Sequence, residues 1–477
     1  MEIDLSQFKK NIISWYPIRN NQTVLEIGNS DEIVDELNKK TMGITSLKIE
    51  EALIGNSIKD KYDFVVLIGI FEKLDNEKEI LKILEFSKSV LKEDGKILLA
   101  MQNKFGMKYW TGEKLNKSLK EYESIVNDEE NVLGLTKIKN ILNHFNFKYK
   151  FYYPLPDYNL TNVIFTDNFM PDNESIDARD LTFTDKENVL NFSERSAYKQ
   201  ILNDDKEIFP FFANSFFIEI SNKEKFEDIN FVSYGITRKK EYQIKTIIKS
   251  DFVYKYANNQ EAENHIKNIS KNIETLKECE LDVLGEFKDN GIESVFLKNS
   301  KSFDKVLMEI YENYGLDKTI EKIKEFKENI LNKLLDEYFE EKNIFDKYEI
   351  KIPVKLKERM HFTENGILDL IFQNCLVKED KIYAYDQEWF EKNVPIEFIL
   401  YRAIIYFTEL RNVEDINNIL ELLDLKQYSE YFEILENKIQ ENLVDQDMWN
   451  LHLESVREIG NTREILNDYK KRLQLAN

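Results

Sequence analysis

Short apolar runs alternate with amphipathic segments over the first half of the chain. Apolar residues dominate Thr23–Ile27, Ile44–Ile49, Tyr62–Gly69 and Gly95–Met101, and this pattern predicts four buried strands. Between the last two, Glu77–Leu91 repeats its apolar positions at helical spacing. Strands and helices that alternate in this way predict a parallel sheet with helices on both faces, whose ligands lie at the carboxyl ends of the strands.

The pattern changes after a charged segment at residues 221–228, which we interpret as a linker. Ile229–Thr237, Tyr242–Ile248 and Asp251–Tyr256 predict three successive strands, and Asn259–Glu278 predicts a helix that follows them. Strands that follow one another without intervening helices are typical of an α+β domain.

Three later segments predict mostly helix. Leu316–Phe339 carries an apolar stripe typical of one long helix, and Pro395–Leu410 is apolar enough to be a core helix. Asp415–Asn477 is amphipathic and acidic. It either completes the second domain or makes a contact between subunits.

These patterns divide the chain into a domain over residues 1–222 and a second over residues 229–477. Within the first, Lys148–Tyr153 predicts a strand whose natural antiparallel partner is Phe211–Ile220. Residues 159–208 then form an insertion. It either covers a pocket as a lid or packs as a solvated arm.

Composition limits the partners of the protein. The 477 residues include 88 Asp and Glu against 66 Lys and Arg, a net charge of -22 that would repel nucleic acid and anionic membranes. Cys279 and Cys375 lie far apart and the four histidines are scattered, which disfavours a zinc site. The N-terminus lacks the apolar core of a signal peptide, and no apolar run approaches the roughly 20 residues of a membrane span. We therefore expect a cytoplasmic protein.

The first predicted strand leads into a turn whose residues could bind a ligand. In the segment VLEIGNS, Glu26 precedes Gly28 and Ser30 ends the turn before a predicted helix at Asp31–Leu37. Gly28 permits close approach of the backbone to a ligand. Glu50 follows the second strand, where a carboxylate can accept hydrogen bonds from two hydroxyls.

These residues resemble the first motifs of class I S-adenosylmethionine-dependent methyltransferases. The antiparallel pair predicted for Lys148–Tyr153 and Phe211–Ile220 resembles the terminal hairpin of their sheet. The resemblance implies a Rossmann-like α/β fold, S-adenosylmethionine as cofactor, and Glu26, Gly28, Ser30 and Glu50 as cofactor-binding residues. Ser30 and Glu32 stand where that family usually has small residues or glycine, so a Rossmann-like domain without a cofactor is the alternative. The three-glycine fingerprint of dinucleotide dehydrogenases is absent.

An aromatic and polar loop at residues 102–112 follows the fourth strand at the carboxyl edge of the sheet. Substrate loops occupy that edge, and we interpret Asn103 as a substrate-positioning residue. The alternative is an asparagine that simply ends a strand.

Gly366–Trp389 places three side chains at spacings that one reaction uses. Asn374 follows Asp369 by five residues, and Asp386 comes twelve residues later, after a predicted hairpin at 375–385 that brings the two ends together. Phosphoryl transfer uses an Asp to orient the attacking hydroxyl and an Asn and an Asp to hold Mg²⁺.

This segment resembles the catalytic segment of aminoglycoside-phosphotransferase-like kinases. The resemblance implies a bilobal α+β kinase-like domain that uses ATP and Mg²⁺, with Asp369 catalytic and Asn374 and Asp386 as metal ligands. Ile367 and Leu368 stand where the family usually has His or Arg. The alternative is that Asp369 caps a turn and Asp386 ends a strand.

Lys255 ends the third strand of the second domain, where such kinases hold the lysine that grips the α- and β-phosphates. Its acidic partner should come from the following helix. We prefer Glu263, and Glu261 and Glu274 remain alternatives.

The combination is similar to bacterial proteins of surface-glycan or flagellin-glycan modification. It implies a bifunctional transferase that phosphorylates a hydroxyl of a small metabolite and methylates its N or O. One alternative is a catalytically silent scaffold that binds glycan-pathway enzymes or a carrier. Another is a methyltransferase whose kinase-like domain only binds substrate. The oligomeric state is open.

Overall fold

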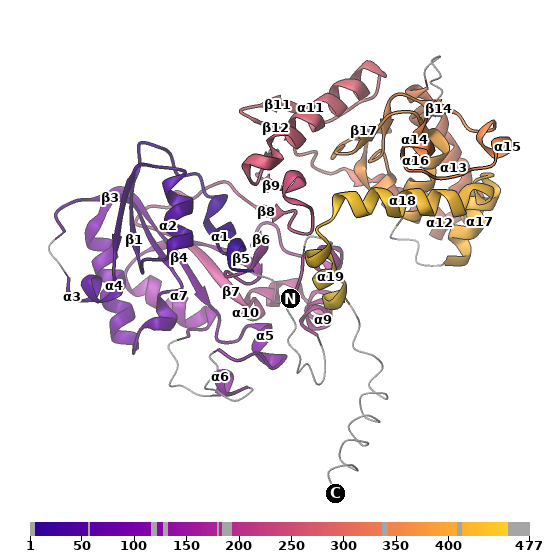
Figure 1. The fold of residues 1–477 in the computed structure, drawn as a ribbon. Coiled ribbons are helices and arrows are strands. Elements are labelled where there is room, and N and C mark those ends of the chain that lie inside the picture. Colours follow the sequence, from indigo (N-terminus) through magenta and orange to yellow (C-terminus); the bar gives the residue numbers. More distant parts are fainter. Residues whose placement is uncertain are drawn as a thin grey trace, which may run out of the picture. The chain divides into compact units, whose positions relative to one another are not determined.

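A computed structural model describes residues 5–55, 58–115, 122–126, 132–178, 181–183, 193–335, 342–407 and 413–456 (Figure 1). The chain forms two compact units. One contains the chain up to Thr237 together with the segment that begins at Gln446, and the other contains Arg238–Asp445. Residues 223–237 and helix α19 (Gln446–Val456) therefore lie in the first unit, outside the domain 1–222 that the sequence suggested.

The strands of the first unit follow the order β2-β1-β3-β4-β7-β5-β6-β8. Strands β1 to β4 are parallel, and β7 is antiparallel to both of its neighbours, β4 and β5. The strands are β1 (Thr23–Ile27), β2 (Gly43–Leu47), β3 (Tyr62–Ile68), β4 (Leu91–Gln102), β5 (Lys148–Pro156), β6 (Thr161–Thr166), β7 (Ser215–Ser221) and β8 (Phe231–Tyr234).

Helices cover both faces of this sheet, which confirms the predicted Rossmann-like α/β architecture. Leu25 packs in one core with Ile83 of α4 and Ile138 of α7, whereas on the opposite face Tyr16 packs edge-on against Phe64 of β3. The helices of this unit are α1 (Asn11–Ser14), α2 (Asp31–Asn38), α3 (Ile49–Ile54), α4 (Glu77–Val90), α5 (Met107–Trp110), α6 (Glu123–Val126), α7 (Leu135–His144), α8 (Asn173–Asp177), α9 (Glu194–Asp204), α10 (Phe209–Phe212) and α19.

The predicted antiparallel pair is confirmed, because β5 pairs with β7. The insertion at 159–208 differs from the prediction in part. Its strand β6 pairs with β5, so this portion extends the sheet and is neither a lid nor a solvated arm. Residues 179–180 and 184–192 of the insertion lie outside the described residues.

One of the three strands predicted to follow the linker belongs to the first unit. β8, which covers the middle of the predicted strand Ile229–Thr237, pairs with β6 of the first unit. The hydroxyl of Tyr234 donates to the carbonyl of Asn11 at 2.7 Å and bonds the hydroxyl of Ser14. These buried bonds keep β8 in the first unit.

The second unit contains a small antiparallel sheet and a larger, mostly helical region. Strands β11-β12-β10-β9 form the sheet, α11 packs against it, and the predicted hairpin is confirmed as β16 and β17. The strands are β9 (Ile244–Ile248), β10 (Phe252–Ala257), β11 (Glu286–Lys288), β12 (Gly291–Val295), β13 (Lys301–Ser302), β14 (Phe362–Thr363), β15 (Gly366–Ile367), β16 (Cys375–Lys378), β17 (Lys381–Ala384), β18 (Phe390–Glu391) and β19 (Val394–Pro395).

One core holds the helical region together, and α16 lies within it as its apolar sequence predicted. The single helix expected over Leu316–Phe339 is wrong. α13 ends at Asn329, and a short 3₁₀ turn at Leu331–Leu334 follows; residues 336–339 lie outside the described part. The helices are α11 (Glu263–Glu278), α12 (Phe303–Tyr314), α13 (Leu316–Asn329), α14 (Ile344–Lys347), α15 (Val354–Lys357), α16 (Ile396–Ile405), α17 (Val413–Leu422) and α18 (Ser429–Leu443).

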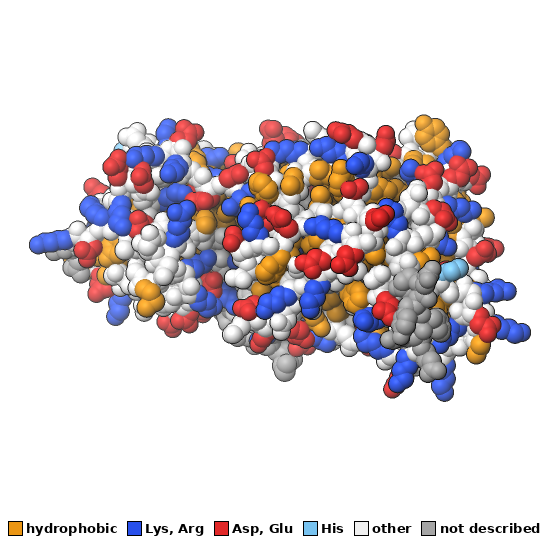
Figure 2. Space-filling model, turned by 90° about the horizontal axis from the view of Figure 1, so that it is seen from above, with side chains coloured by type: hydrophobic (Ala, Val, Ile, Leu, Met, Phe, Trp, Pro, Cys, Tyr) orange, Lys and Arg blue, Asp and Glu red, His pale blue; other side chains and the backbone are white. Residues whose placement is uncertain are grey.

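The surface mixes both signs of charge. Figure 2 shows acidic and basic side chains interspersed over one face, without a large field of either sign. Among the helices that the structure describes, none has the length and apolarity that a membrane span requires.

Candidate functional site

The turn after β1 is held by a buried carboxylate. Glu26 is 3 % exposed, and its oxygens accept hydrogen bonds from the backbone N–H groups of Asn29 at 3.1 Å and Ser30 at 3.3 Å. Burial raises the pKa of Glu26 above its usual range, and the two N–H donors oppose that shift. Glu26 therefore stabilises the backbone of the turn, whereas the sequence had suggested that its carboxylate binds a cofactor.

Gly28 is required by both backbone and space. Its φ of +122° is one that side chains rarely allow, and a Cβ atom would lie 2.4 Å from Cδ1 of Ile70. The side chain of Ile70, after β3, thus packs against the backbone of the turn. A larger residue at position 28 would have to displace the end of that side chain.

Ser30 and Glu50 differ in how available their side chains are to a ligand. The hydroxyl of Ser30 donates to Glu32 at 3.0 Å and accepts from Lys9 at 3.1 Å, so its bonds are already made within the protein. Glu50 lies in the first turn of α3, since β2 ends at Leu47, and it is exposed near the carboxyl end of that strand. Of the predicted cofactor residues, Glu50 remains available to a ligand.

A cavity of about 430 Å³ borders the turn. Lys9 and Glu32, which bond Ser30, line it together with Lys108 and Asp157, and the Lys108 ammonium contacts the Asp157 carboxylate at 2.6 Å. The turn at Gly28, the cavity beside it and the exposed carboxylate of Glu50 are the kinds of feature that could bind the polar groups of S-adenosylmethionine.

Asn103 is buried and structural, which corrects its prediction as a substrate-positioning residue. Its side-chain amide donates to the carbonyls of Phe211 and Ala213, both at 2.8 Å, and its oxygen accepts from the N–H of Phe105 at 3.2 Å. With these bonds made and no exposed surface, the side chain has nothing left to offer a substrate.

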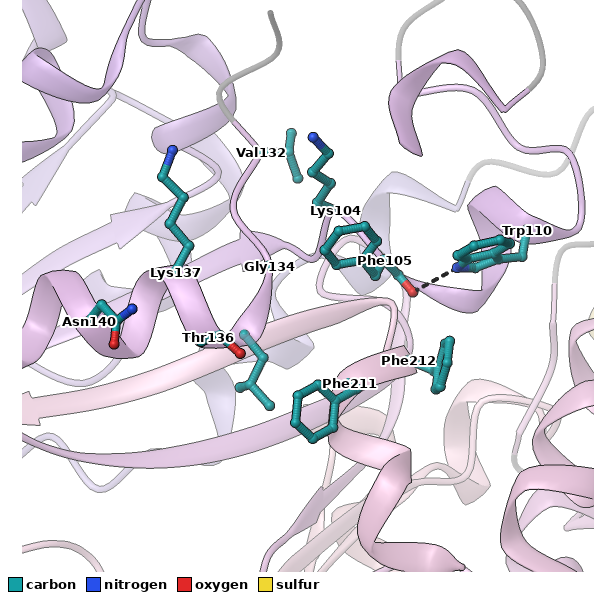
Figure 3. A pocket seen from close by; sticks show the side chains of 11 residues that line it. Lys104, Phe105, Trp110, Val132, Gly134, Thr136, Lys137, Asn140, Phe211 and Phe212 are labelled. Carbon is teal, nitrogen blue, oxygen red and sulfur yellow. Dashed lines mark hydrogen bonds between the residues drawn. The ribbon is translucent and has the colours of Figure 1, made fainter. Parts of the chain in front are cut away.

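Asn103 instead connects two walls of the larger cavity of about 760 Å³ in Figure 3. Residues 104–110, 132–140 and 211–212 contribute its lining. The rings of Phe105, Trp110, Phe211 and Phe212 lie around it, and the indole N–H of Trp110 donates to the carbonyl of Phe105 at 3.2 Å. The sequence had indicated an aromatic loop here, but not the contribution of α10.

In the second unit, Lys255 of β10 meets two carboxylates. Its ammonium contacts Asp386 and lies 2.9 Å from Glu388. Glu388 is 4 % exposed and also contacts Arg238, and its Oε2 lies 3.3 Å from Nε2 of His265. Burial alone would raise the pKa of Glu388, but the nearby Arg238 and Lys255 charges hold it well below its usual range.

The structure corrects the predicted acidic partner of Lys255. Glu263, Glu261 and Glu274 of the preferred helix segment are exposed, and none of them pairs with Lys255. Glu388 occupies that role. The signal in the sequence was its position two residues after Asp386, in the segment already expected to meet Lys255.

Asp369 is less accessible than a catalytic base should be. It is 7 % exposed, and one carboxylate oxygen accepts from the backbone N–H groups of Glu388 at 3.0 Å and Trp389 at 3.1 Å. Burial raises the pKa of Asp369 to about 6, although Arg402 nearby acts in the opposite direction. In this conformation the carboxylate organises the segment after Asp386, so the predicted contact with a substrate hydroxyl is not formed.

The hairpin brings Asn374 and Asp386 together at its open end, because the N–H of Tyr385 donates to the carbonyl of Asn374 at 3.0 Å. The amide of Asn374 donates to the carbonyl of Asp369 at 3.1 Å. The side chains of Asn374 and Asp386 offer the oxygen ligands that Mg²⁺ prefers. The ammonium of Lys255, however, neutralises the charge of Asp386. Within the described residues, no group of three or more His, Cys, Asp or Glu side chains is placed to hold a metal. The described residues therefore do not fit a complete magnesium site.

No protein-family model matches the chain, and no curated protein matches its sequence. Similar solved structures include a SAM-dependent methyltransferase from Archaeoglobus fulgidus, with 14% identity over 46% of this chain and 95% of that one and a TM-score of 0.29. The plantazolicin methyltransferase BamL, in complex with a triazolic desmethylPZN analog and SAH, has 12% identity over 46% and 82%, with a TM-score of 0.24. A phosphoethanolamine N-methyltransferase 2 of Haemonchus contortus has 16% identity over 45% and 52%, with a TM-score of 0.24.

At these identities and TM-scores the alignments add no argument about activity. The strand order of the first unit is observed directly, and its antiparallel β7 between β4 and β5 is the arrangement that the methyltransferase resemblance implied.

Proposed function

We propose that the first unit is an S-adenosylmethionine-dependent methyltransferase that acts on N or O of a small molecule. The observation that carries this proposal is the turn at Gly28, which Glu26 braces at the carboxyl end of β1 beside a cavity. Ligands of open α/β sheets bind at that edge.

The chain's own residues would hold and orient the reactants. Gly28 allows the backbone to approach the cofactor, and Glu50 accepts hydrogen bonds from its ribose hydroxyls. When bound, S-adenosylmethionine would supply a methyl group: the lone pair of the acceptor would bond to the methyl carbon as the carbon–sulfur bond breaks, sulfur would keep the electrons of that bond, and the acceptor's proton would pass to water. Most of the rate enhancement would come from holding acceptor and methyl group in line.

Titration of the full chain with S-adenosylmethionine tests this proposal through binding. Glu50→Gln removes a charge-assisted acceptor, so we expect roughly tenfold weaker binding, which corresponds to about 1.4 kcal/mol. Asp35→Asn, an exposed change on α2, is the matched control and should bind like the unaltered chain. Equal affinities of the two variants would remove Glu50 from the site.

A second candidate function, phosphoryl transfer from ATP to a hydroxyl, concerns the second unit. It is favoured by the contact between Lys255 and Asp386, and by the hairpin that places Asn374 beside Tyr385, the residue before Asp386. Lys255 and Arg238 carry charge that could face phosphates if the cluster opened. The burial of Asp369 and the neutralised Asp386 stand against it in the present conformation.

Replacement of Asp386 separates this candidate from a binding role. Asp386→Asn should abolish ATP turnover with magnesium and leave the response to S-adenosylmethionine intact. Asp380→Asn is a close control, because both residues have positive φ, +59° and +63°, which Asn tolerates, and Asp380 is exposed in the hairpin turn. Turnover that survives in Asp386→Asn would sink the kinase assignment.

The use of both activities on one metabolite, in surface-glycan or flagellin-glycan modification, rests on the resemblance alone. If the chain responds to neither S-adenosylmethionine nor ATP with Mg²⁺, the scaffold that binds glycan-pathway enzymes becomes the better proposal. A response to S-adenosylmethionine alone would favour a methyltransferase whose second unit binds substrate.

A further inference from the structure

Three of the aromatic rings that line the cavity in Figure 3 are partly exposed. Phe105 is 41%, Trp110 40% and Phe211 50% exposed. The cavity volume of about 760 Å³ lies within the roughly 300–1,000 Å³ of small-molecule sites. These rings offer flat faces on which a ring system could stack.

The walls of this cavity are held in place by buried hydrogen bonds. Asn103 bonds the carbonyl of Phe211 and the N–H of Phe105, and the N–H of Lys104 donates to the carbonyl of Leu133 at 3.3 Å. The loop after β4, the segment before α7 and helix α10 are thus tied to one another. The cavity is built before a ligand arrives, which reduces the ordering cost of binding.

The described lining of the cavity differs in charge from the chain as a whole. The protein carries a net charge of -22, yet among the described residues that line the cavity none is acidic and two are lysines. In Figure 3 the side chains of Lys104 and Lys137 extend to the side opposite Phe211 and Phe212. Lys137 pairs with Glu77 at 2.7 Å, but both side chains are about half exposed, 54% and 47%, so this pair is weak and can open.

The cavity lies at the edge of the sheet where methyl transfer would occur. Parallel strands β1, β3 and β4 end at the same edge, and the turn at Gly28 follows β1 while Phe105 follows β4. Two strand spacings of roughly 4.8 Å place these strand ends about 10 Å apart. A ring-containing acceptor can span that distance.

From these observations we propose that the cavity binds the acceptor substrate, and that the acceptor is a planar ring compound with an acidic group. The rings of Phe105 and Phe211 hold the flat body, and Lys104 and Lys137 face the acid. This assignment of a substrate class rests on the proposed methyltransferase function.

Calorimetric titration of the full chain with 2-naphthoate tests the proposal, because this probe combines a flat ring system with a carboxylate. Phe105→Ala and Phe211→Ala should each weaken binding at least tenfold. Phe287→Ala, a change of an equally exposed ring (45%) on β11, is the control and should bind unchanged. The neutral 2-naphthamide should bind at least threefold more weakly than the acid, and that difference should shrink at high salt.

Equal affinities of Phe211→Ala and Phe287→Ala, or no binding of 2-naphthoate, would overturn the proposal. Equal binding of the acid and the amide would overturn its acidic part. The variants are exposed-ring truncations, and thermal unfolding checks that each is folded; Phe211→Leu replaces Phe211→Ala if it is not.

Titration with S-adenosylmethionine in the same preparations separates this proposal from the function on which it rests. Cofactor binding without binding of 2-naphthoate would refute the acceptor pocket and leave the methyltransferase proposal standing. Phe211-dependent binding of 2-naphthoate without cofactor binding would support the pocket and refute the methyltransferase.

Discussion

The two units use a buried glutamate in opposite ways. In the first unit, the carboxylate of Glu26 accepts hydrogen bonds from backbone N–H groups of the turn that it supports, and these donors are uncharged. In the second, Glu388 lies among Arg238, Lys255 and His265. A carboxylate held by backbone shapes a site and leaves its surroundings open, whereas one held by cations consumes the charges that an anionic ligand would need.

This difference separates stability from readiness to bind. The turn at Gly28 lies beside a cavity, so a ligand can approach its backbone without displacing the carboxylate of Glu26. ATP phosphates could reach Lys255 only by displacing Asp386 or Glu388. We therefore expect replacements in the second unit to affect stability most, and replacements in the first to affect binding as well.

The largest effect should come from Glu388→Ala. Removing one partner of a buried charge cluster leaves Arg238 and Lys255 without their carboxylate, a loss that typically costs about 3–5 kcal/mol. Urea denaturation followed by tryptophan fluorescence should show this destabilisation, since Trp389 is the next residue. A loss below about 1 kcal/mol would contradict the cluster.

Gly28→Ala should destabilise the first unit by about 2–4 kcal/mol, because backbone strain and the 2.4 Å approach to Ile70 add together. Gly112→Ala is the matched control, since its φ is +101° but nothing lies within 4 Å of its Cβ position. The difference between the two variants measures the packing contact. Similar losses in both would mean that the contact with Ile70 carries no weight.

The pH dependence of Asp369 gives a smaller effect with a defined sign. Its folded pKa of about 6 exceeds the unfolded value of 3.8, so between these values the folded state binds more protons than the unfolded state. This carboxyl group therefore lowers stability as pH rises from about 4 to 6, and the penalty, on the order of 3 kcal/mol, is complete above pH 6.

Asp369→Asn has no such titration. Its stability relative to the unaltered chain should rise by up to about 3 kcal/mol between pH 4 and 7. Denaturation curves at a series of pH values measure this difference, in which the contributions of other carboxyl groups cancel. A difference that falls with pH would show that Asp369 is ionised and stabilising in the folded state.

Glu263→Gln should have the smallest effect. The sequence suggested this residue as the partner of Lys255, but the side chain is exposed and the ion pairs of Lys255 go to other carboxylates. We expect a change within about 0.5 kcal/mol. A loss comparable to that of Glu388→Ala would restore the helix as the source of the partner.

The local sequence pattern predicted individual strands and hairpins better than it predicted which elements and side chains contact one another. β1 and the hairpin of β16 and β17 were predictable because apolar periodicity and turn residues are local signals. The meeting of Asn374 and Asp386 followed from that hairpin. The choice of Glu388 over Glu263 depends on which elements pack together, and a local pattern does not contain that information.

Two further differences have the same origin. β8 has the sequence of any short strand, and its pairing with β6 and the hydrogen bonds of Tyr234 to Asn11 and Ser14 place it in the first unit. Asn103 was recognised as special, but whether its amide faces a substrate or the carbonyls of Phe211 and Ala213 depends on a helix more than a hundred residues later.

The most direct test of the account is isothermal titration of the full chain with S-adenosylmethionine, repeated with Gly28→Ala and Gly112→Ala. We predict saturable binding at one site that Gly28→Ala abolishes and Gly112→Ala preserves. No binding to the unaltered chain at millimolar cofactor, or equal binding by all three proteins, would contradict a methyltransferase site at the turn of Gly28.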